Sequence, residues 1–262
     1  MHTRTPRLWI AVTVTAVVVV LVYLMQWLIA PPGGTADYSF QTAAGVLHFG
    51  VLPEAIPLVV LLAAVVALPW RRDTLFEADT PRRSWWLVVP VLLFVLIWVK
   101  YPFTDIALDV PGLASLALWA LCIGLLEELL IRGVLLTGLR VHVSELVAYV
   151  VSTLAFAVIH AGNVFNGQEI GDTIGQIVLS VGMGSVLYVS RRVTGTLIVP
   201  VVLHAMWDFS VFSLPDDFDG TGPAGILLLA TVALAVVGGI PAAIVVARRR
   251  GNPLRAASSH VV

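Results

Sequence analysis

The chain has 262 residues, of which 59% are hydrophobic and only 12% are charged. Ordinary soluble domains carry about 25% charged residues, so this composition excludes both a soluble globular protein and a disordered one. A single cysteine, Cys122, excludes an internal disulfide framework, and its apolar surroundings favour a core position. The formal net charge of -1 excludes nucleic-acid binding through bulk charge.

Eight apolar segments follow one another along the chain. They are continuously apolar, without alternation of polar and apolar residues, so they predict helices rather than a β-barrel. The segments are Leu8–Ala30, Ala55–Trp70, Trp85–Val99, Leu113–Leu136, Leu146–His160, Ile174–Val189, Leu197–Phe212 and Ala224–Ala247. With no internal repeat and no long polar segment, residues 1–262 are predicted to form one all-α integral-membrane domain of about eight helices.

The first segment follows Arg4 and Arg7, as a secretory signal peptide would. Its apolar stretch of about 23 residues is too long for a usual signal core. Pro31 and Pro32 follow it in place of a small-residue cleavage site. We therefore expect an uncleaved first membrane helix.

Basic residues predict the orientation in the membrane, because cytoplasmic loops are rich in arginine and lysine. With eight spans, 13 of the 15 basic residues fall on one side, and both termini share that side. The sequence therefore predicts a multi-pass cell-membrane protein with cytoplasmic N and C termini. The 13 residues are Arg4, Arg7, Arg71, Arg72, Arg82, Arg83, Arg140, Arg191, Arg192, Arg248, Arg249, Arg250 and Arg255.

Ionisable residues inside the spans carry most of the functional information. A charge near mid-bilayer costs roughly 2.5–3.5 kcal/mol even on the mildest scale, so each should have a partner or a task. Six such residues lie on three spans: Glu127, Glu128 and Arg132, then His160, then His204 and Asp208.

Helical geometry predicts how these groups are arranged. Glu128 and Arg132 are four residues apart and should pair, whereas Glu127 lies ~140° away from Arg132 around the helix and should project elsewhere. His204 and Asp208 also share a helix face. Along each helix, roughly 18–24 Å separate a charged residue near the helix end from the candidates Glu127, His160, His204 and Asp208. Because these distances are similar, the four side chains should lie at a similar depth and could form one site.

Each pattern taken alone has a structural interpretation. Glu128 and Arg132 are typical of a structural ion pair. A single histidine at a helix end, such as His160, is typical of the membrane interface. His204 and Asp208 could form interhelical hydrogen bonds. A shared depth, a spare carboxylate and two histidines together favour a functional site.

These residues resemble the motifs of the CAAX-protease and bacteriocin-processing (CPBP, or Abi) family of intramembrane proteases. The motifs EExxxR, FxxxH and HxxxN/D read here as Glu127-Glu128-x-x-x-Arg132, Phe156-x-x-x-His160 and His204-x-x-x-Asp208. The resemblance covers about residues 120–213, within a family core of approximately 113–213. Asp208 stands where many members have Asn.

The resemblance implies an intramembrane endopeptidase that cleaves a membrane-embedded or lipid-anchored protein or peptide within the lipid bilayer. Glu127 would be the general base, His160 would hold the same water and protonate the leaving amine, and His204 with Asp208 would stabilise the oxyanion. Glu128, Arg132 and Phe156 would support the site.

We expect no cofactor and no nucleic-acid partner. Zinc bound by Glu127, His160, His204 and Asp208 is the competing chemistry, but no His-Glu-x-x-His helix is present. Two other function classes remain open: a non-proteolytic membrane scaffold or bacteriocin-immunity protein, and a proton-coupled transporter. Arginine outnumbers lysine 14 to 1, which favours a bacterial origin of high GC content.

Overall fold

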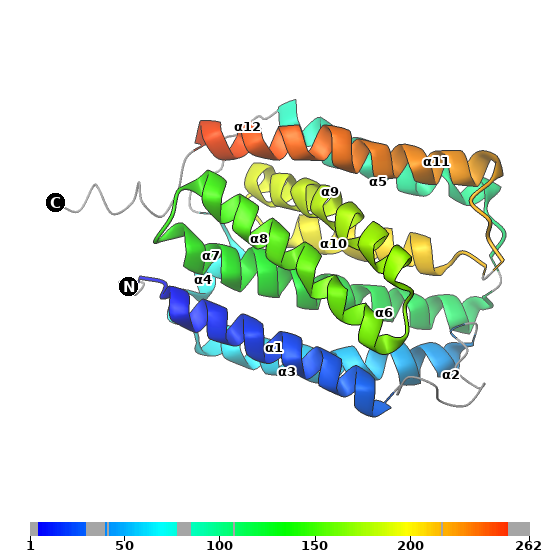
Figure 1. Ribbon diagram of the computed structural model, residues 1–262, viewed down its shortest axis with the longest axis horizontal. Coiled ribbons are helices and arrows are strands. Elements are labelled where there is room, and N and C mark those ends of the chain that lie inside the picture. Colours follow the sequence, from blue (N-terminus) through cyan, green and yellow to red (C-terminus); the bar gives the residue numbers. More distant parts are fainter. Residues whose placement is uncertain are drawn as a thin grey trace.

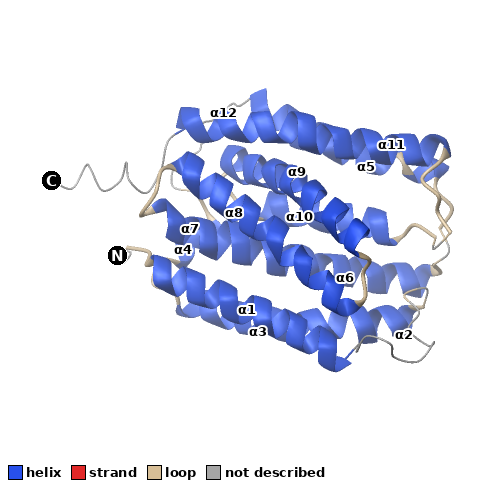
Figure 2. Cartoon of the chain, viewed as in Figure 1, coloured by secondary structure: helices blue, strands red, loops and turns tan. Residues whose placement is uncertain are grey.

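The computed structural model describes residues 5–29, 40, 42–77, 85–106, 108–215 and 217–250. Arg4, Arg82, Arg83 and Arg255, which contribute to the predicted orientation, lie outside these residues, as do Pro31 and Pro32. All the regular secondary-structure elements of the described residues are helices (Figure 2). The described loops add one isolated β-bridge, between Phe76 and Thr196. The predicted all-α fold class is therefore confirmed.

The helical elements join end to end into long rods, some of which contain a π-helical or 3-10 turn. In chain order they are α1 (Leu8–Ile29), α2 (Ala43–Gly45), η1 (Val46–Val51), α3 (Leu52–Ala67), α4 (Arg71–Leu75), η2 (Trp85–Leu87), α5 (Val88–Val99), η3 (Tyr101–Phe103), α6 (Val110–Glu128), η4 (Leu129–Leu135), α7 (Leu136–Arg140), α8 (Glu145–Ile159), η5 (His160–Asn166), α9 (Ile170–Thr194), α10 (Ile198–Phe212), α11 (Gly222–Ala233), η6 (Leu234–Gly239) and α12 (Ile240–Arg250).

Seven of the described rods are long and apolar enough to cross a membrane, and α10 is a shorter apolar helix of 15 residues. Each of the eight predicted segments coincides for most of its length with one of these rods or with α10, although the second extends past Ala67, where its helix ends. The second begins earlier than predicted, because the rod runs over Ala43–Ala67 and carries His48 and Glu54 inside it. These polar residues and Pro53 interrupt the apolar pattern, so the sequence did not reveal where this helix begins.

Local sequence signals set the helix ends that frame the site. Asp109 caps α6 by accepting a hydrogen bond from the Gly112 amide, and Ser144 caps α8 through the Val147 amide. Gly195 ends α9 with φ of 77°, a conformation that favours glycine. Each of these ends leads into or out of a helix that bears one of the sequence motifs.

The motif-bearing helices occupy the middle of the bundle. In Figure 1, α1 and α3 lie along one side and α5, α11 and α12 along the other, with α6 to α10 between them. Gly124 lets α6 approach α10 closely, because a Cβ at this position would lie 2.9 Å from the Val201 carbonyl oxygen. Large apolar side chains are exposed on the outer helices, as lipid contact requires, for example Val20 and Leu229.

The start of α1 and the end of α12 lie at the same end of the bundle (Figure 1). The predicted loop positions of three arginines at this end are wrong. Arg140 is the last residue of α7, Arg191 and Arg192 lie in the last turn of α9, and all three are at most 2% exposed. Glu77, the acid that pairs with all three, is distant from them in sequence, so the apolar pattern alone could not reveal that they are buried.

Candidate active site

The first motif lies where α6 passes into the π-helical segment η4. The carboxylate of Glu128 accepts a hydrogen bond from Arg132 Nη1 at 2.7 Å, and both side chains are almost completely buried. Glu127 points elsewhere, and its side chain is 21% exposed. The predicted pairing is confirmed: the Glu128 carboxylate pairs with Arg132, and the Glu127 carboxylate does not.

The third motif lies on α10 and faces the first. His204 Nδ1 lies 3.2 Å from Glu128 Oε1, and since a carboxylate oxygen accepts, Nδ1 donates this hydrogen bond. His204 Nε2 then lies 3.5 Å from Asp208 Oδ2 and 3.8 Å from Glu127 Oε2. The imidazole therefore connects both glutamates of the first motif to Asp208.

The second motif lies at the end of α8. His160 is the first residue after this helix, and its Nδ1 donates to the Phe156 carbonyl oxygen at 2.8 Å. In neutral imidazole this bond leaves Nε2 as the nitrogen with a free lone pair. The Phe156 ring packs edge-on against His160 and His204, with centroids 5.2 and 5.7 Å apart, and the Arg132 guanidinium lies 4.0 Å from its centroid. Phe156 thus joins all three motifs.

The candidate catalytic side chains converge on one cavity of about 210 Å³. Its walls include Trp119, Ile123 and Leu130, which supply the apolar surroundings that strengthen electrostatic interactions. Glu127 Oε2 and Asp208 Oδ2 are buried and have no hydrogen-bond partner among the described residues. The candidates that line this cavity are Glu127, His160, His204 and Asp208.

A second cavity of about 360 Å³ adjoins the first and shares His160, His204 and Asp208 with it. Most of its other walls come from α9 and α10, including Met183 and Trp207, and Phe156 of α8 also lines it. The two histidines and Asp208 therefore lie between two spaces, one of which also holds Glu127.

The residues considered for zinc are not arranged as a metal site. Within the described part of the chain, no group of three or more His, Cys, Asp or Glu side chains is placed to hold a metal ion. Glu128, the acid nearest to His204 Nδ1, is already paired with Arg132.

Sequence reasoning missed the cavity wall contributed by α1 and α3. Glu54, which is 7% exposed, lines the cavity and accepts a hydrogen bond from the Gln26 amide at 2.9 Å. Tyr23 lines it too, and its hydroxyl donates to the Ile159 carbonyl oxygen at the end of α8. Gln26 inside the first apolar segment and Glu54 immediately before the second were the signal that could have revealed this wall.

Two hydrogen-bonded pairs of side-chain amides lie beside this wall. Gln26 accepts from Asn166 at 2.6 Å, and Asn163 donates to Gln176 at 2.9 Å. Asn163 and Gln176 both line the cavity. The turn after His160 is therefore tied to α1 on one side and to α9 on the other.

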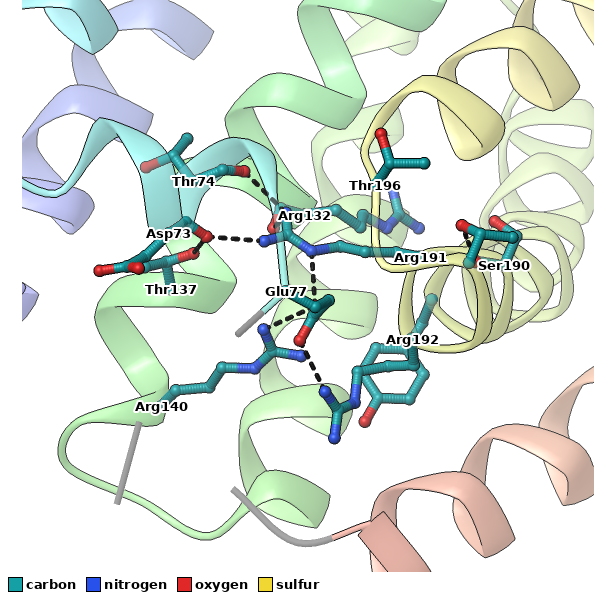
Figure 3. Close-up of polar contacts among 12 residues, drawn as sticks. Asp73, Thr74, Glu77, Arg132, Thr137, Arg140, Ser190, Arg191, Arg192 and Thr196 are labelled. Atoms are coloured by element: carbon teal, nitrogen blue, oxygen red, sulfur yellow. Dashed lines mark hydrogen bonds and ion pairs between the residues drawn. The ribbon is translucent and has the colours of Figure 1, made fainter. Parts of the chain in front are cut away.

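A second buried polar cluster lies at the end of the bundle where α1 begins (Figures 1 and 3). Glu77 follows α4, and its fully buried carboxylate pairs with three arginines at 2.6–2.9 Å: Arg140, Arg191 and Arg192. Burial alone would raise the pKa of Glu77, but the three guanidinium groups outweigh burial and hold that pKa well below its usual range.

This cluster connects the peripheral segment after α3 to the first motif. Arg191 donates to the carbonyl oxygens of Asp73, Thr74 and Arg132 (Figure 3). The segment is also held by backbone hydrogen bonds from the Glu77 amide to the Gly195 carbonyl and from the Leu197 amide to the Leu75 carbonyl. Arg191 therefore fixes the backbone of the helix that carries Glu128 and Arg132.

Comparison with known proteins supports the resemblance drawn from the motifs. Residues 109–210, about two fifths of the chain, match the family model described as type II CAAX prenyl endopeptidase Rce1-like. This range contains every residue of the three motifs. A search of the curated proteins found no match.

Proposed function

We propose that this multi-pass membrane protein, which carries an Rce1-like CAAX-protease segment at residues 109–210, is an intramembrane endopeptidase. It would hydrolyse a peptide bond of a membrane-embedded or lipid-anchored protein or peptide. The observation that carries the proposal is the convergence of Glu127, His160, His204 and Asp208, from three helical rods, on one cavity.

Glu127 is the proposed general base. Its carboxylate is free of Arg132, lines the cavity and has an oxygen without a hydrogen-bond partner among the described residues. A water bound there would lose a proton to Glu127 as its oxygen attacks the carbonyl carbon of the scissile peptide. The neighbouring carboxylate of Glu128 cannot take this role while it neutralises Arg132.

His160 is the proposed second partner of this water and the later proton donor. Its Nδ1 is engaged with the Phe156 carbonyl, so Nε2 is the atom left to accept a hydrogen bond from the water. After attack, a proton delivered through His160 to the leaving nitrogen would complete peptide cleavage.

His204 and Asp208 are the proposed oxyanion stabilisers. His204 is anchored by Glu128 through Nδ1, so Nε2 has a fixed direction in the cavity. A protonated Nε2 would donate to the oxygen of the tetrahedral intermediate, and a protonated Asp208 would add a second donor. The scheme uses only these side chains and a water molecule, and no step is assigned to a metal.

Glu127→Gln tests the proposal. The substitution keeps the size of the side chain but removes the base, so we expect cleavage to disappear while melting temperature and membrane insertion are retained. New N-termini in membranes of cells expressing the wild type and Glu127→Gln at equal levels would be compared by mass spectrometry. Candidate substrates would then be cleaved by purified protein in liposomes.

Glu169→Gln is the matched control, because it removes the same charge from an exposed residue that does not line the cavity. Undiminished cleavage by Glu127→Gln would contradict the proposal. A cellular phenotype that is the same in wild type and Glu127→Gln, without any cleavage, would favour the scaffold alternative.

A further inference from the structure

A polar residue without a role in the proposed mechanism lies between the two adjoining cavities. The proposed catalytic residues His160, His204 and Asp208 line both cavities, and the other described residues that line both are Gln176 and Phe212. These residues form the shared wall. Gln176 belongs to α9 and is half-buried. Among the described residues of the shared wall, Gln176 is therefore the polar side chain to which no function has been assigned.

A hydrogen bond fixes the orientation of the Gln176 amide. Its Oε1 accepts from Asn163 Nδ2 at 2.9 Å, and Asn163 lies three residues after His160 in the 3-10 turn η5. Because side chains three residues apart eclipse one another in a 3-10 helix, this bond joins Gln176 to the face of the turn that also carries His160. With Oε1 engaged, the Nε2 group remains, and its hydrogens have no acceptor among the described residues.

The negative charge that develops during peptide hydrolysis needs a donor of this kind. In the proposed scheme this charge forms against His204 and Asp208, whose Nε2 and Oδ2 lie 3.5 Å apart on the shared wall. An ionised Asp208 carboxylate only accepts hydrogen bonds and would repel an oxyanion, so Asp208 donates only when it carries a proton. A primary amide is neutral and keeps its N–H donors in every protonation state of the site.

We propose that Gln176 is a further catalytic residue, whose Nε2 donates a hydrogen bond to the oxyanion of the tetrahedral intermediate beside His204. The inference rests on the proposed endopeptidase function and completes its oxyanion site. The Nε2 hydrogens stay on the amide throughout the reaction, so the proton transfers proposed for Glu127 and His160 are unchanged. Gln176 thus supplies a donor that does not depend on the protonation of Asp208.

The experiment measures kcat, KM and melting temperature of the full-length protein in liposomes, on a peptide that the wild type cleaves and Glu127→Gln does not. Gln176→Leu removes the amide at similar side-chain size. Gln176→Glu keeps an oxygen that accepts from Asn163 but replaces the N–H donor by a carboxylate. Gln168→Leu is the matched control, because Gln168 is also a half-buried glutamine and lines the second cavity but not the described wall of the first.

We expect Gln176→Leu to lower kcat about 10²-fold, as for the loss of one oxyanion-hole donor, and to change KM by less than about threefold, because the oxyanion forms only after the substrate has bound. Gln176→Glu should lower kcat at least as much, since its carboxylate repels the oxyanion. Gln168→Leu should keep kcat within about twofold of the wild type. In an Asp208→Asn background, Gln176→Leu should lower kcat only about tenfold, because the new amide is a permanent donor at the same site.

An unchanged kcat in Gln176→Leu would overturn the inference. A Gln176→Glu variant as active as the wild type would also overturn it, because Gln176 would then only anchor Asn163 and the His160 turn. This second variant answers the question even if Gln176→Leu fails to fold. Either result leaves the endopeptidase function standing. If no peptide is cleaved in a Glu127-dependent manner, the proposed function fails and this inference with it.

Discussion

Glu127 and Glu128 are chemically identical neighbours with opposite environments. Glu128 is completely buried between the Arg132 guanidinium and His204 Nδ1, while Glu127 faces the cavity. One helical step of about 100° separates the carboxylate that pairs with Arg132 and His204 from the one that we propose as the general base. The tandem glutamate therefore combines support and candidate chemistry in two consecutive residues.

Phe156 shows how an apolar residue can organise a polar site. Its ring contacts the Arg132 guanidinium, His160 and His204 at once, and it is only 2% exposed. The cation–π contact with Arg132 adds to the ion pair with Glu128 in balancing a charge that water cannot reach. The ring also sets the separation between the two histidines.

Asp208 provides a prediction at the scale of one side chain. If Asp208 acts as a donor to the oxyanion, Asp208→Asn keeps a donor at the same place and should retain activity within about tenfold. Asp208→Leu removes the donor and should lower kcat by about 10²–10³, as for the loss of one oxyanion-hole donor. The measurement is kcat for both variants on a peptide cleaved by the wild type. Equal loss in both variants would mean that the charge of Asp208, not a donated hydrogen bond, is needed.

The turn after α8 is the element on which the position of His160 depends. Tyr23 of α1 packs directly on this turn, and its hydroxyl satisfies the Ile159 carbonyl at the helix end. Gly162 permits the approach, because a Cβ there would lie 2.1 Å from the Tyr23 ring. A first-span residue outside the family-matched segment thus positions a residue of the second motif.

Gly162→Ala should therefore displace either α1 or the His160 turn and lower both cleavage and melting temperature. Overpacking of this kind costs about 1–3 kcal/mol. Adding Tyr23→Ala should recover part of the stability, because it removes the ring that the new methyl group meets. Gly175→Ala is the control, since nothing lies within 4 Å of a Cβ at that helical position. Equal effects of the two glycine substitutions would argue against this packing.

The ionic cluster around Glu77 gives a prediction for the segment after α4. Since the folded state holds the pKa of Glu77 below its unfolded value of about 4.3, the carboxylate stabilises the fold at any pH above that value. The contribution is lost as the pH falls below about 4 toward the folded pKa. At neutral pH, Glu77→Gln removes the carboxylate that pairs with Arg191 and leaves Arg140 and Arg192 to share Glu145, so the substitution should cost about 3–5 kcal/mol.

Melting temperatures of the purified protein in detergent between pH 3 and pH 8 would test this expectation. The difference between wild type and Glu77→Gln should be constant above pH 5 and should shrink steadily below pH 4. A difference independent of pH would show that packing, rather than the charge of Glu77, stabilises the segment. Glu169→Gln, at an exposed position, should show no such difference at neutral pH.

At the scale of the whole molecule, the orientation in the membrane is the main prediction. The start of α1 and the end of α12 lie at one end of the bundle, and the basic residues assign that end to the cytoplasm (Figure 1). A C-terminal fusion to green fluorescent protein should fluoresce, and a C-terminal fusion to alkaline phosphatase should be inactive. Phosphatase inserted between η3 and α6 should be active. Reversed activities would place the termini outside.

The arrangement of the bundle encloses the candidate site. Outer helices such as α1 and α11 present apolar side chains, while α6, α8 and α10 bring the motifs together between them. The two adjoining cavities share the histidines and Asp208. The proposed catalytic residues therefore lie inside the bundle, between helices whose outer faces are apolar.

The sequence by itself determined the helical membrane fold, the Glu128–Arg132 pair and the set of motif residues. These follow from apolar length, from the periodicity of one helix and from the high cost of a charge in lipid, all of which are local properties. Cavity residues such as Glu54 and Tyr23, and the burial of Arg191, were decided only by the tertiary structure. Their partners lie on other helices, and one-helix periodicity carries no information about which distant side chain will satisfy a buried charge.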